Sequence, residues 1–280
     1  MTAQRITNPA STAAREIDGS ARAPGVALVT GATAGIGAEF ARQLAARGFD
    51  LVLVARDSDR LEQKASALRS EFGIMVEVLT ADLVDREGLA RVEARAAVPE
   101  RHPGGLRRIT MLVNNAGFGL RQPFDENSIE DEQRHLDLLV TAPMRVTHAA
   151  IGQMLTSASG TIVTIASVAG FGPRGTYGAA KSWVLSFSRW ANSYYRPLGI
   201  SVTAVAPGFV HTEFHGRMNV NTAGVPRFMW LDAATVVRLA LQDIDRGIAV
   251  SVPTLRYKVV VLLSGLLPQR VIAAGVFRGR

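Results

Sequence analysis

The 280-residue sequence contains no cysteine. This absence excludes a disulfide framework, a thiolate zinc site, an iron–sulfur cluster and cysteine nucleophile chemistry. The sequence also lacks any uninterrupted run of 18 or more apolar residues, so we expect no membrane-spanning helix. Residues 1–24 are polar and have no apolar central stretch, so they predict a flexible N-terminal extension rather than a secretory signal.

Outside the C-terminal segment, positive and negative charges nearly balance. The formal net charge is +7, and residues 254–280 hold five basic residues and no acidic one, which leaves +2 for the rest of the chain. A nucleic-acid binder needs basic residues spread over one face of its fold, so we expect no nucleic-acid partner. The length of the chain and its 48% of hydrophobic residues predict a single compact domain over residues 25–253. Since the sequence shows neither a secretory signal nor a spanning segment, we expect a cytoplasmic protein.

Short runs rich in Val, Ile and Leu alternate with segments of helical spacing. Runs that are apolar throughout predict strands buried on both faces, as in a parallel sheet. The alternation predicts a doubly wound, Rossmann-like α/β fold of about seven strands with helices on both faces. The expected strands are 26–30, 51–55, 75–80, 109–113, 161–166, 200–206 and 248–251, and the expected helices are 36–47, 58–71, 86–97, 129–155, 176–196 and 232–244.

A glycine-rich turn lies between the first strand and the first helix. Glycines permit a tight turn and a close approach of the backbone to a pyrophosphate, and the helix N-terminus offers free N–H groups. The placement therefore predicts a dinucleotide site. Its expected cofactor-binding residues are Gly31, Thr33, Ala34, Gly35, Ile36 and Gly37.

The ends of the next two strands predict how the adenosine half of the cofactor is held. An acidic residue after the second strand would bind the ribose 2′-hydroxyl of NAD, but Ala55 and Arg56 stand there. Arg56 suits a 2′-phosphate, which favours NADP(H) over NAD(H). After the third strand, Asp82 and Leu83 are expected at the adenine ring; the alternative for Asp82 is an N-cap of the following helix.

Tyr177 and Lys181 are four residues apart at the start of a predicted helix. They share a helix face, and an ammonium beside a phenol favours the phenolate and lowers the pKa of the tyrosine. The pair predicts a general acid that protonates an alkoxide, or a base for the reverse reaction. Ser167, at the end of the fifth strand, offers a hydroxyl to the substrate oxygen.

In these motifs the sequence resembles the short-chain dehydrogenase/reductase family, over about residues 25–250. The resemblance rests on the glycine turn, the Asn-Asn-Ala-Gly motif at 114–117, Ser167, Tyr177 with Lys181, and the Pro-Gly motif that begins at 207. It implies hydride transfer between a nicotinamide and a carbonyl or alcohol carbon. It further implies cofactor contacts from Tyr177 and Lys181 and from Asn114, Ala116, Gly117, Pro207, Gly208, Val210 and Thr212. In the resemblance, the segment from Pro207 to Thr212 lines the nicotinamide site.

The sequence departs from that family at two places. The family's second asparagine, which holds a water in the proton path, falls on Leu139, and the loop at 171–176 between Ser167 and Tyr177 is shorter than usual. Leu139 motivates an alternative function as a non-catalytic NADP(H)-binding sensor or partner module. A methyltransferase of similar fold is a further alternative, but it would leave Tyr177 and Lys181 without a role.

Two segments carry further predictions. The resemblance places a substrate lid at about 212–231. An apolar group after the sixth strand suits an apolar, lipid-like substrate or packs on the core; it comprises Phe209, Phe214, Met218, Phe228, Met229 and Trp230. The pair His211 and His215 leaves a metal site as a minor alternative, and we predict none. The apolar and basic tail, 254–280, predicts an interface of a homo-oligomer or intramolecular packing; peripheral membrane contact is the alternative.

Overall fold

The computed structural model describes residues 25–100, 107–120, 122–212 and 226–266, with the backbone alone for 264–266. The predicted extension at 1–24, most of the predicted lid and the end of the predicted tail therefore lie outside the described residues.

A parallel sheet of seven strands forms the centre of the described chain, in the order β3-β2-β1-β4-β5-β6-β7. Leu28 of β1 pairs with Val52 of β2 on one side and with Leu112 of β4 on the other. The strand order therefore reverses between β1 and β4, which in such sheets marks the ligand site at the carboxyl ends. The strands are β1 (Val26–Thr30), β2 (Asp50–Ala55), β3 (Val76–Thr80), β4 (Met111–Asn114), β5 (Gly160–Ile165), β6 (Ile200–Val205) and β7 (Val250–Ser251).

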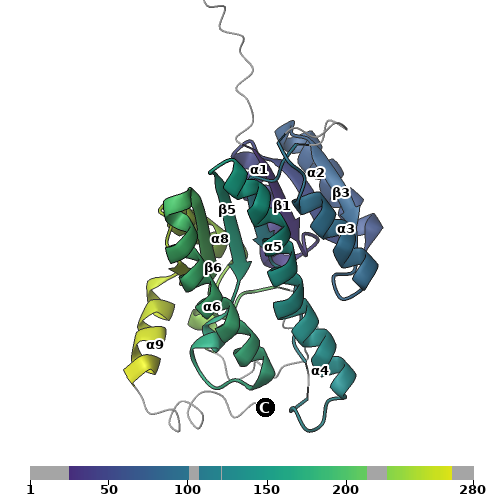
Figure 1. Ribbon diagram of the computed structural model, residues 1–280. Coiled ribbons are helices and arrows are strands. Elements are labelled where there is room, and N and C mark those ends of the chain that lie inside the picture. The colour runs from purple at the N-terminus through teal and green to yellow at the C-terminus, as the bar shows by residue number, and fades with distance from the viewer. Residues whose placement is uncertain (1–24, 101–106, 121, 213–225, 267–280) are drawn as a thin grey trace, which may run out of the picture.

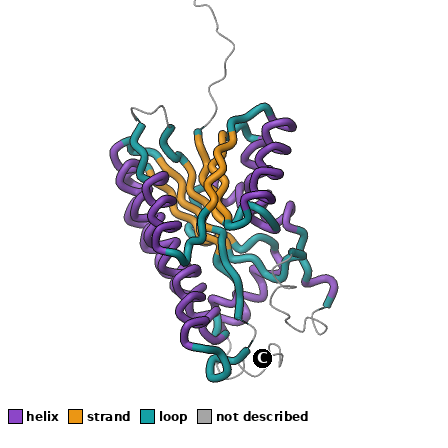
Figure 2. The backbone as a smooth tube through the Cα atoms, turned by 90° about the vertical axis from the view of Figure 1, so that its right-hand side faces the viewer, coloured by secondary structure: helices purple, strands orange, loops and turns teal. Residues whose placement is uncertain are grey.

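Helices cover both faces of this sheet, as Figure 2 shows. Residues of α1 (Gly35–Ala46), α2 (Ser58–Phe72) and α8 (Ala233–Asp245) pack with one set of strand side chains. Those of α3 (Arg86–Ala96), α5 (Ala142–Thr156) and α6 (Gly175–Tyr195) pack with the other set. Both faces of the strands are thus buried, which confirms the predicted doubly wound fold.

Side-chain caps fix where several helices begin. Asp57 accepts a hydrogen bond of 3.0 Å from the Arg60 N–H at the start of α2. Asp85 accepts one of 2.7 Å from the Gly88 N–H at the start of α3. Asp85 is thus the cap of α3, so the alternative of Asp82 as that cap is wrong.

The predicted helix at 129–155 is wrong as one regular helix. The structure has α4 (Ile129–Leu136), a π-helical turn η1 (Asp137–Thr141) and then α5. A π turn inserts one residue into the helical repeat, so α4 and α5 present different faces, and such turns are frequent at functional sites. Leu139 lies in this turn and is almost completely buried.

The first part of the predicted tail forms helix α9 (Leu255–Leu266). In Figure 1, α9 and α4 both lie towards the lower edge of the molecule, where the strands end. Tyr257 is 1% exposed and packs on the core, whereas Leu255 and Leu262 are 76% and 66% exposed. Intramolecular packing therefore accounts for one side of α9. Within the described ranges, no helix combines the length and the apolar character that crossing a membrane requires.

The central strands predict a clear stability contrast. Leu112 of β4 is completely buried, so Leu112→Ala should lower the free energy of unfolding by about 3 kcal/mol, because it removes apolar contacts and leaves a cavity. The control Leu136→Ala, at a position 46% exposed on α4, should change it by less than about 1 kcal/mol. Urea unfolding of the three proteins measures both changes, and equal losses would contradict the described core.

Candidate active site

The glycine turn after β1 has the geometry of a phosphate cradle. Gly31 and Gly35 have φ values of +67° and +56°, which favour glycine, and a Cβ on Gly31 would lie 2.8 Å from the Asn115 side chain. Helix α1 begins at Gly35, and the residue before it is Ala34, which has no side chain to cap the first N–H groups. Those N–H groups are therefore available to an anion. The residues present fit the pyrophosphate of a dinucleotide.

Asn115 ties this turn to the end of β4. Its side chain donates hydrogen bonds to the carbonyl oxygens of Thr30 and Gly31, at 2.9 and 3.1 Å. The Thr30 hydroxyl in turn accepts from the backbone N–H groups of Asn115 and Ala116, at 2.9 and 3.1 Å. The sequence prediction omitted Asn115 as a site residue, and its place inside the Asn-Asn-Ala-Gly motif was the available signal.

Asn114, the last residue of β4, is buried and points the other way. Its side-chain amide donates to the hydroxyl of Thr147 on α5, at 3.1 Å, and lies 3.5 Å from that of Thr164 on β5. Asn114 therefore connects β4 to helix α5 and to strand β5. The remaining predicted residue of this motif, Gly117, approaches Leu139: a Cβ on Gly117 would lie 3.0 Å from the leucine side chain.

The structure brings Arg56 and Asp82 together at the ends of β2 and β3. Their closest charged atoms are 3.8 Å apart, and the Arg56 side chain is 70% exposed. An exposed pair at this distance is weakly held, so the guanidinium is free to turn towards another anion. Asp82 accepts a hydrogen bond of 3.1 Å from the Val84 N–H, and Leu83 is buried beside it. Asp57, the nearest acidic neighbour in sequence, is engaged as the α2 cap.

Ser167, Tyr177 and Lys181 lie on consecutive segments beyond the end of β5. Ser167 precedes the short 3₁₀ helix η2 (Val168–Phe171), and its hydroxyl accepts from the Ala169 N–H at 3.1 Å. Tyr177 and Lys181 occupy the first two turns of α6, and the Lys181 Nζ lies 5.7 Å from the centre of the Tyr177 ring. The predicted phenol–ammonium pair is therefore present in the geometry of the fold.

The ammonium of Lys181 is buried at this place. The side chain is 6% exposed, and Nζ donates a hydrogen bond of 2.6 Å to the carbonyl of Ile165, the last residue of β5. Burial disfavours the charged form and lowers the pKa of Lys181 to about 8. At neutral pH the group is still mostly charged, so Tyr177 has a cation beside it.

His135 of α4 is a site residue that the sequence reasoning missed. Its ring is 1% exposed, lies 6.1 Å from the Tyr177 ring with an angle of 24° between the planes, and meets Phe118 edge-on at 5.4 Å. His135 stands one helical turn before Leu139. That spacing was a signal that another side chain of α4 faces the site, although the π turn hides the register.

The shortened loop before Tyr177 ends at Arg174, which is the residue before α6. Arg174 is half-buried, and this burial lowers the pKa of its guanidinium. Its carbonyl accepts from the Gly178 N–H at 2.9 Å, and a Cβ on Gly178 would lie 2.7 Å from the Arg174 Cβ. The loop therefore runs close against the first turn of α6.

The segment after β6 lies across the start of α1. A Cβ on Gly35 would lie 3.0 Å from the Thr212 side chain, so Thr212 covers the glycine turn. Val210 forms a β-bridge with Leu231, where the chain returns from the predicted lid. Next to this bridge the rings of His211 and Trp230 stack at 4.6 Å. The structure thus brings the predicted phosphate and nicotinamide segments together.

Of the two histidines of the minor metal alternative, the structure describes only His211. His215 lies outside the described residues, and within the described ranges no three His, Cys, Asp or Glu side chains form a metal-binding group. His211 instead stacks on Trp230, as described above.

Comparisons with known proteins agree with this geometry. A family model described as short chain dehydrogenase matches residues 25–223. The chain is 34% identical over 194 residues to sulfoacetaldehyde reductase 2 of Chromohalobacter salexigens, covering 68% of this chain and 74% of that protein. A short-chain dehydrogenase of Sphingobium yanoikuyae, solved in complex with NADPH, is 35% identical with a TM-score of 0.77, covering 91% of this chain and 98% of that one.

A second solved structure is a bulky-bulky ketone specific alcohol dehydrogenase of Comamonas testosteroni. It is 32% identical, has a TM-score of 0.73, and covers 92% of this chain and 97% of that one.

The buried ammonium predicts a pH-dependent stability difference between the protein and Lys181→Met. The pKa of about 8 in the folded state lies below the ordinary lysine pKa of 10.5, so between these pH values the unfolded chain binds more protons. The stability of the protein relative to Lys181→Met should therefore rise with pH in this window, by at most about 3 kcal/mol. Urea unfolding at pH 7 and at the upper end of the window measures it.

Lys64→Met is the matched control, since Lys64 is exposed on α2. Its stability difference from the unmodified protein should stay constant over the same range. A Lys181→Met difference that is equally flat would contradict burial of the charge.

Proposed function

The chain belongs to the short-chain dehydrogenase/reductase family, and from this premise we propose that it transfers a hydride between NADP(H) and the carbonyl or alcohol carbon of an apolar substrate, with Tyr177 as general acid/base. The observation that carries the proposal is the phenol of Tyr177 one helical turn from the buried ammonium of Lys181, above the end of β5. The comparisons do not support the non-catalytic alternative that Leu139 motivated.

Each catalytic side chain has a separate task. When bound, the nicotinamide supplies or accepts the hydride at the substrate carbon. In the reducing direction Ser167 donates a hydrogen bond to the carbonyl oxygen, and Tyr177 gives its hydroxyl proton to that oxygen, so the product is an alcohol. The charge of Lys181 stabilises the phenolate that remains, which takes a proton back from solvent. Oxidation runs through the same groups in reverse.

Binding of the cofactor falls to the residues around the glycine turn. The free N–H groups at the start of α1 hold the pyrophosphate, and Arg56 pairs with the 2′-phosphate. Exposure of Arg56 and its long contact with Asp82 support a preference for NADP(H). So does the relative of Sphingobium yanoikuyae, which was solved with NADPH.

The apolar substrate is proposed from the described base of the lid. Phe209 and Trp230 lie 5.6 Å apart, Trp230 stacks on His211, and Phe228 is 64% exposed. Aromatic side chains at the mouth of a site bind apolar groups. The similarity to a dehydrogenase specific for bulky ketones points the same way.

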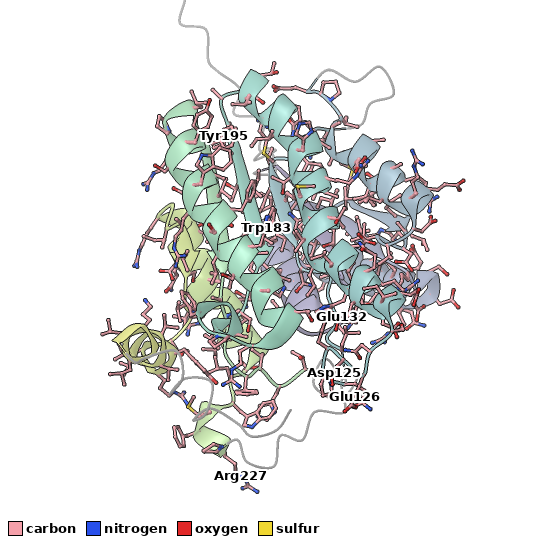
Figure 3. The ribbon with its side chains drawn as sticks, turned by 60° about the horizontal axis from the view of Figure 1, so that its bottom comes forward. Asp125, Glu126, Glu132, Trp183, Tyr195 and Arg227 are labelled. Carbon is pink, nitrogen blue, oxygen red and sulfur yellow. The ribbon has the colours of Figure 1, made fainter. Side chains whose placement is uncertain are left out.

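A homo-oligomer is supported by an exposed aromatic row on α6. Trp183, Phe187, Trp190 and Tyr194 are in successive ring contact, and Trp190 and Tyr194 are 53% and 59% exposed. Figure 3 shows Trp183 and Tyr195 along this helix. Exposed aromatic patches of this kind mark protein interfaces. We propose that a second copy of the chain covers them.

We further propose that the protein is cytoplasmic. The outer side of α9 exposes Leu255, Leu262 and Leu263 beside the basic residues Arg256 and Lys258. This exposed apolar side suits packing on a second copy of the chain, and peripheral contact with an anionic lipid surface is the alternative.

Tyr177→Phe tests the catalytic assignment. Loss of the hydroxyl removes the proton donor but keeps the ring, so kcat should fall about 100- to 10,000-fold while the Kd for NADPH stays within about threefold. Turnover with a panel of bulky ketones and fluorescence titration of NADPH measure the two. Tyr194→Phe, the same change on an exposed tyrosine, is the control. Undiminished turnover in Tyr177→Phe would remove Tyr177 from its role.

Arg56→Asp tests the cofactor assignment. A carboxylate repels the 2′-phosphate and accepts from a 2′-hydroxyl, so the ratio of kcat/KM with NADPH to that with NADH should fall at least about tenfold. Arg238→Asp, on an exposed position of α8, changes the net charge equally and should leave the ratio unchanged. The same ratio in both variants would show that Arg56 does not contact the cofactor.

A further inference from the structure

We propose that Tyr257 of the C-terminal helix α9 is a positioning residue that holds the nicotinamide side of the active site in place. The inference rests on the proposed function, because the family resemblance behind that function implies that residues 207–212 line the nicotinamide site. It extends the active site to a helix beyond residues 25–223, which are those that the family model matches.

The phenol of Tyr257 bridges two segments of the site. Its oxygen accepts a hydrogen bond of 3.0 Å from the N–H of Phe209, in the segment after β6. Its hydroxyl donates one of 2.8 Å to the carbonyl of Met229, in the 3₁₀ helix η4 (Arg227–Met229) at the returning end of the predicted lid. Burial raises the pKa of Tyr257, so the hydroxyl keeps its proton and its donor role throughout the neutral range.

The ring of Tyr257 also sets the position of Gly208. A Cβ on Gly208 would lie 1.8 to 2.2 Å from ring atoms of Tyr257, so the ring rests directly on the backbone of this glycine. Glycine is thus required here by the close approach of an aromatic ring, and residues 207–209 cannot move towards α9. The two hydrogen bonds act against movement in the opposite direction.

Two further observations show that α9 is held firmly against the site. It packs against η2, which directly follows Ser167. The turn that leads into α9 contains Thr254 with a φ of +132°, a conformation that a threonine adopts only when its surroundings impose it. Helix α9 therefore contacts the segments after β5 and after β6 and the end of the lid.

Loss of the Tyr257 hydroxyl should affect binding of only one half of the cofactor. The glycine turn and Arg56 bind the adenosine and phosphate half, whereas the two hydrogen bonds of the Tyr257 hydroxyl go to Phe209 and Met229. Residues 207–212 face the nicotinamide half. If Tyr257 positions them, its hydroxyl should matter for NADPH and not for 2′,5′-ADP, which carries the 2′-phosphate but no nicotinamide.

Tyr257→Phe removes the bridging oxygen and keeps the ring on Gly208. Calorimetric or fluorescence titration should show the Kd for NADPH raised about tenfold, since two hydrogen bonds to the backbone are lost, and the Kd for 2′,5′-ADP unchanged within about twofold. The kcat for a ketone should fall as well. Tyr194→Phe, the same change in the last turn of α6, should change neither Kd.

The outcomes separate the two proposals. Failure of the unmodified protein to bind NADPH would overturn the proposed function itself. If the unmodified protein binds NADPH, two results for Tyr257→Phe would overturn the role of Tyr257. One is an unchanged affinity for NADPH. The other is an equal loss of affinity for NADPH and 2′,5′-ADP, because a general loosening of the fold affects both halves of the cofactor.

Arg256→Ala carries the test if Tyr257→Phe does not fold. Arg256 lies on the surface, and its guanidinium donates to the carbonyl of Phe228, so it ties α9 to the same end of the lid. The substitution should raise the Kd for NADPH about threefold and leave the Kd for 2′,5′-ADP unchanged. Unchanged affinity for both ligands would then overturn the proposal.

Discussion

A buried positive charge at the end of a central strand is the constraint on which the site depends. The side chain of Lys181, near the start of α6, donates a hydrogen bond to the carbonyl of Ile165, so β5 fixes its position. Helix α6 must lie close against η2 for this to happen: a Cβ on Gly170 would lie 2.8 Å from the Lys181 backbone. The arrangement is unfavourable for stability, because burial lowers the pKa of the ammonium. In return, the arrangement holds a cation beside the phenol of Tyr177. A solvent-exposed lysine side chain would move among several positions and would not stay there.

Much of this architecture could be predicted from the sequence because the determining interactions are local or repeat along the chain. Strands buried on both faces produce runs of branched apolar residues, and β1 was predicted at the residues where it occurs. The starts of α2 and α8 are marked by Asp57 and Asp232, whose carboxylates accept backbone N–H groups. The glycine turn is similarly local, since the conformation of Gly31 and Gly35 requires those residues themselves.

The residues that the sequence did not reveal owe their roles to contacts between distant segments. His135 meets Tyr177 across 42 positions of the chain, just before a π turn that no residue pattern marked. Tyr257 contacts Phe209 and Met229 because α9 folds back over the end of β6. In the sequence Tyr257 is one apolar residue among many in a tail, and only the three-dimensional position of its hydroxyl distinguishes it.

Leu139 stands where the family resemblance leads us to expect an asparagine, and the structure shows what the leucine does instead. An asparagine there would present polar atoms, whereas the leucine is 1% exposed and fills the space under Gly117. Its side chain therefore supports the Asn-Asn-Ala-Gly segment by packing. The groups that carry charge and protons in the proposed reaction are on other segments: Ser167 follows β5, and Tyr177 and Lys181 are on α6. Leu139 thus fills by packing the place where the family resemblance leads us to expect an asparagine, while the serine hydroxyl, the phenol and the ammonium of the proposed reaction lie on the segments that follow β5.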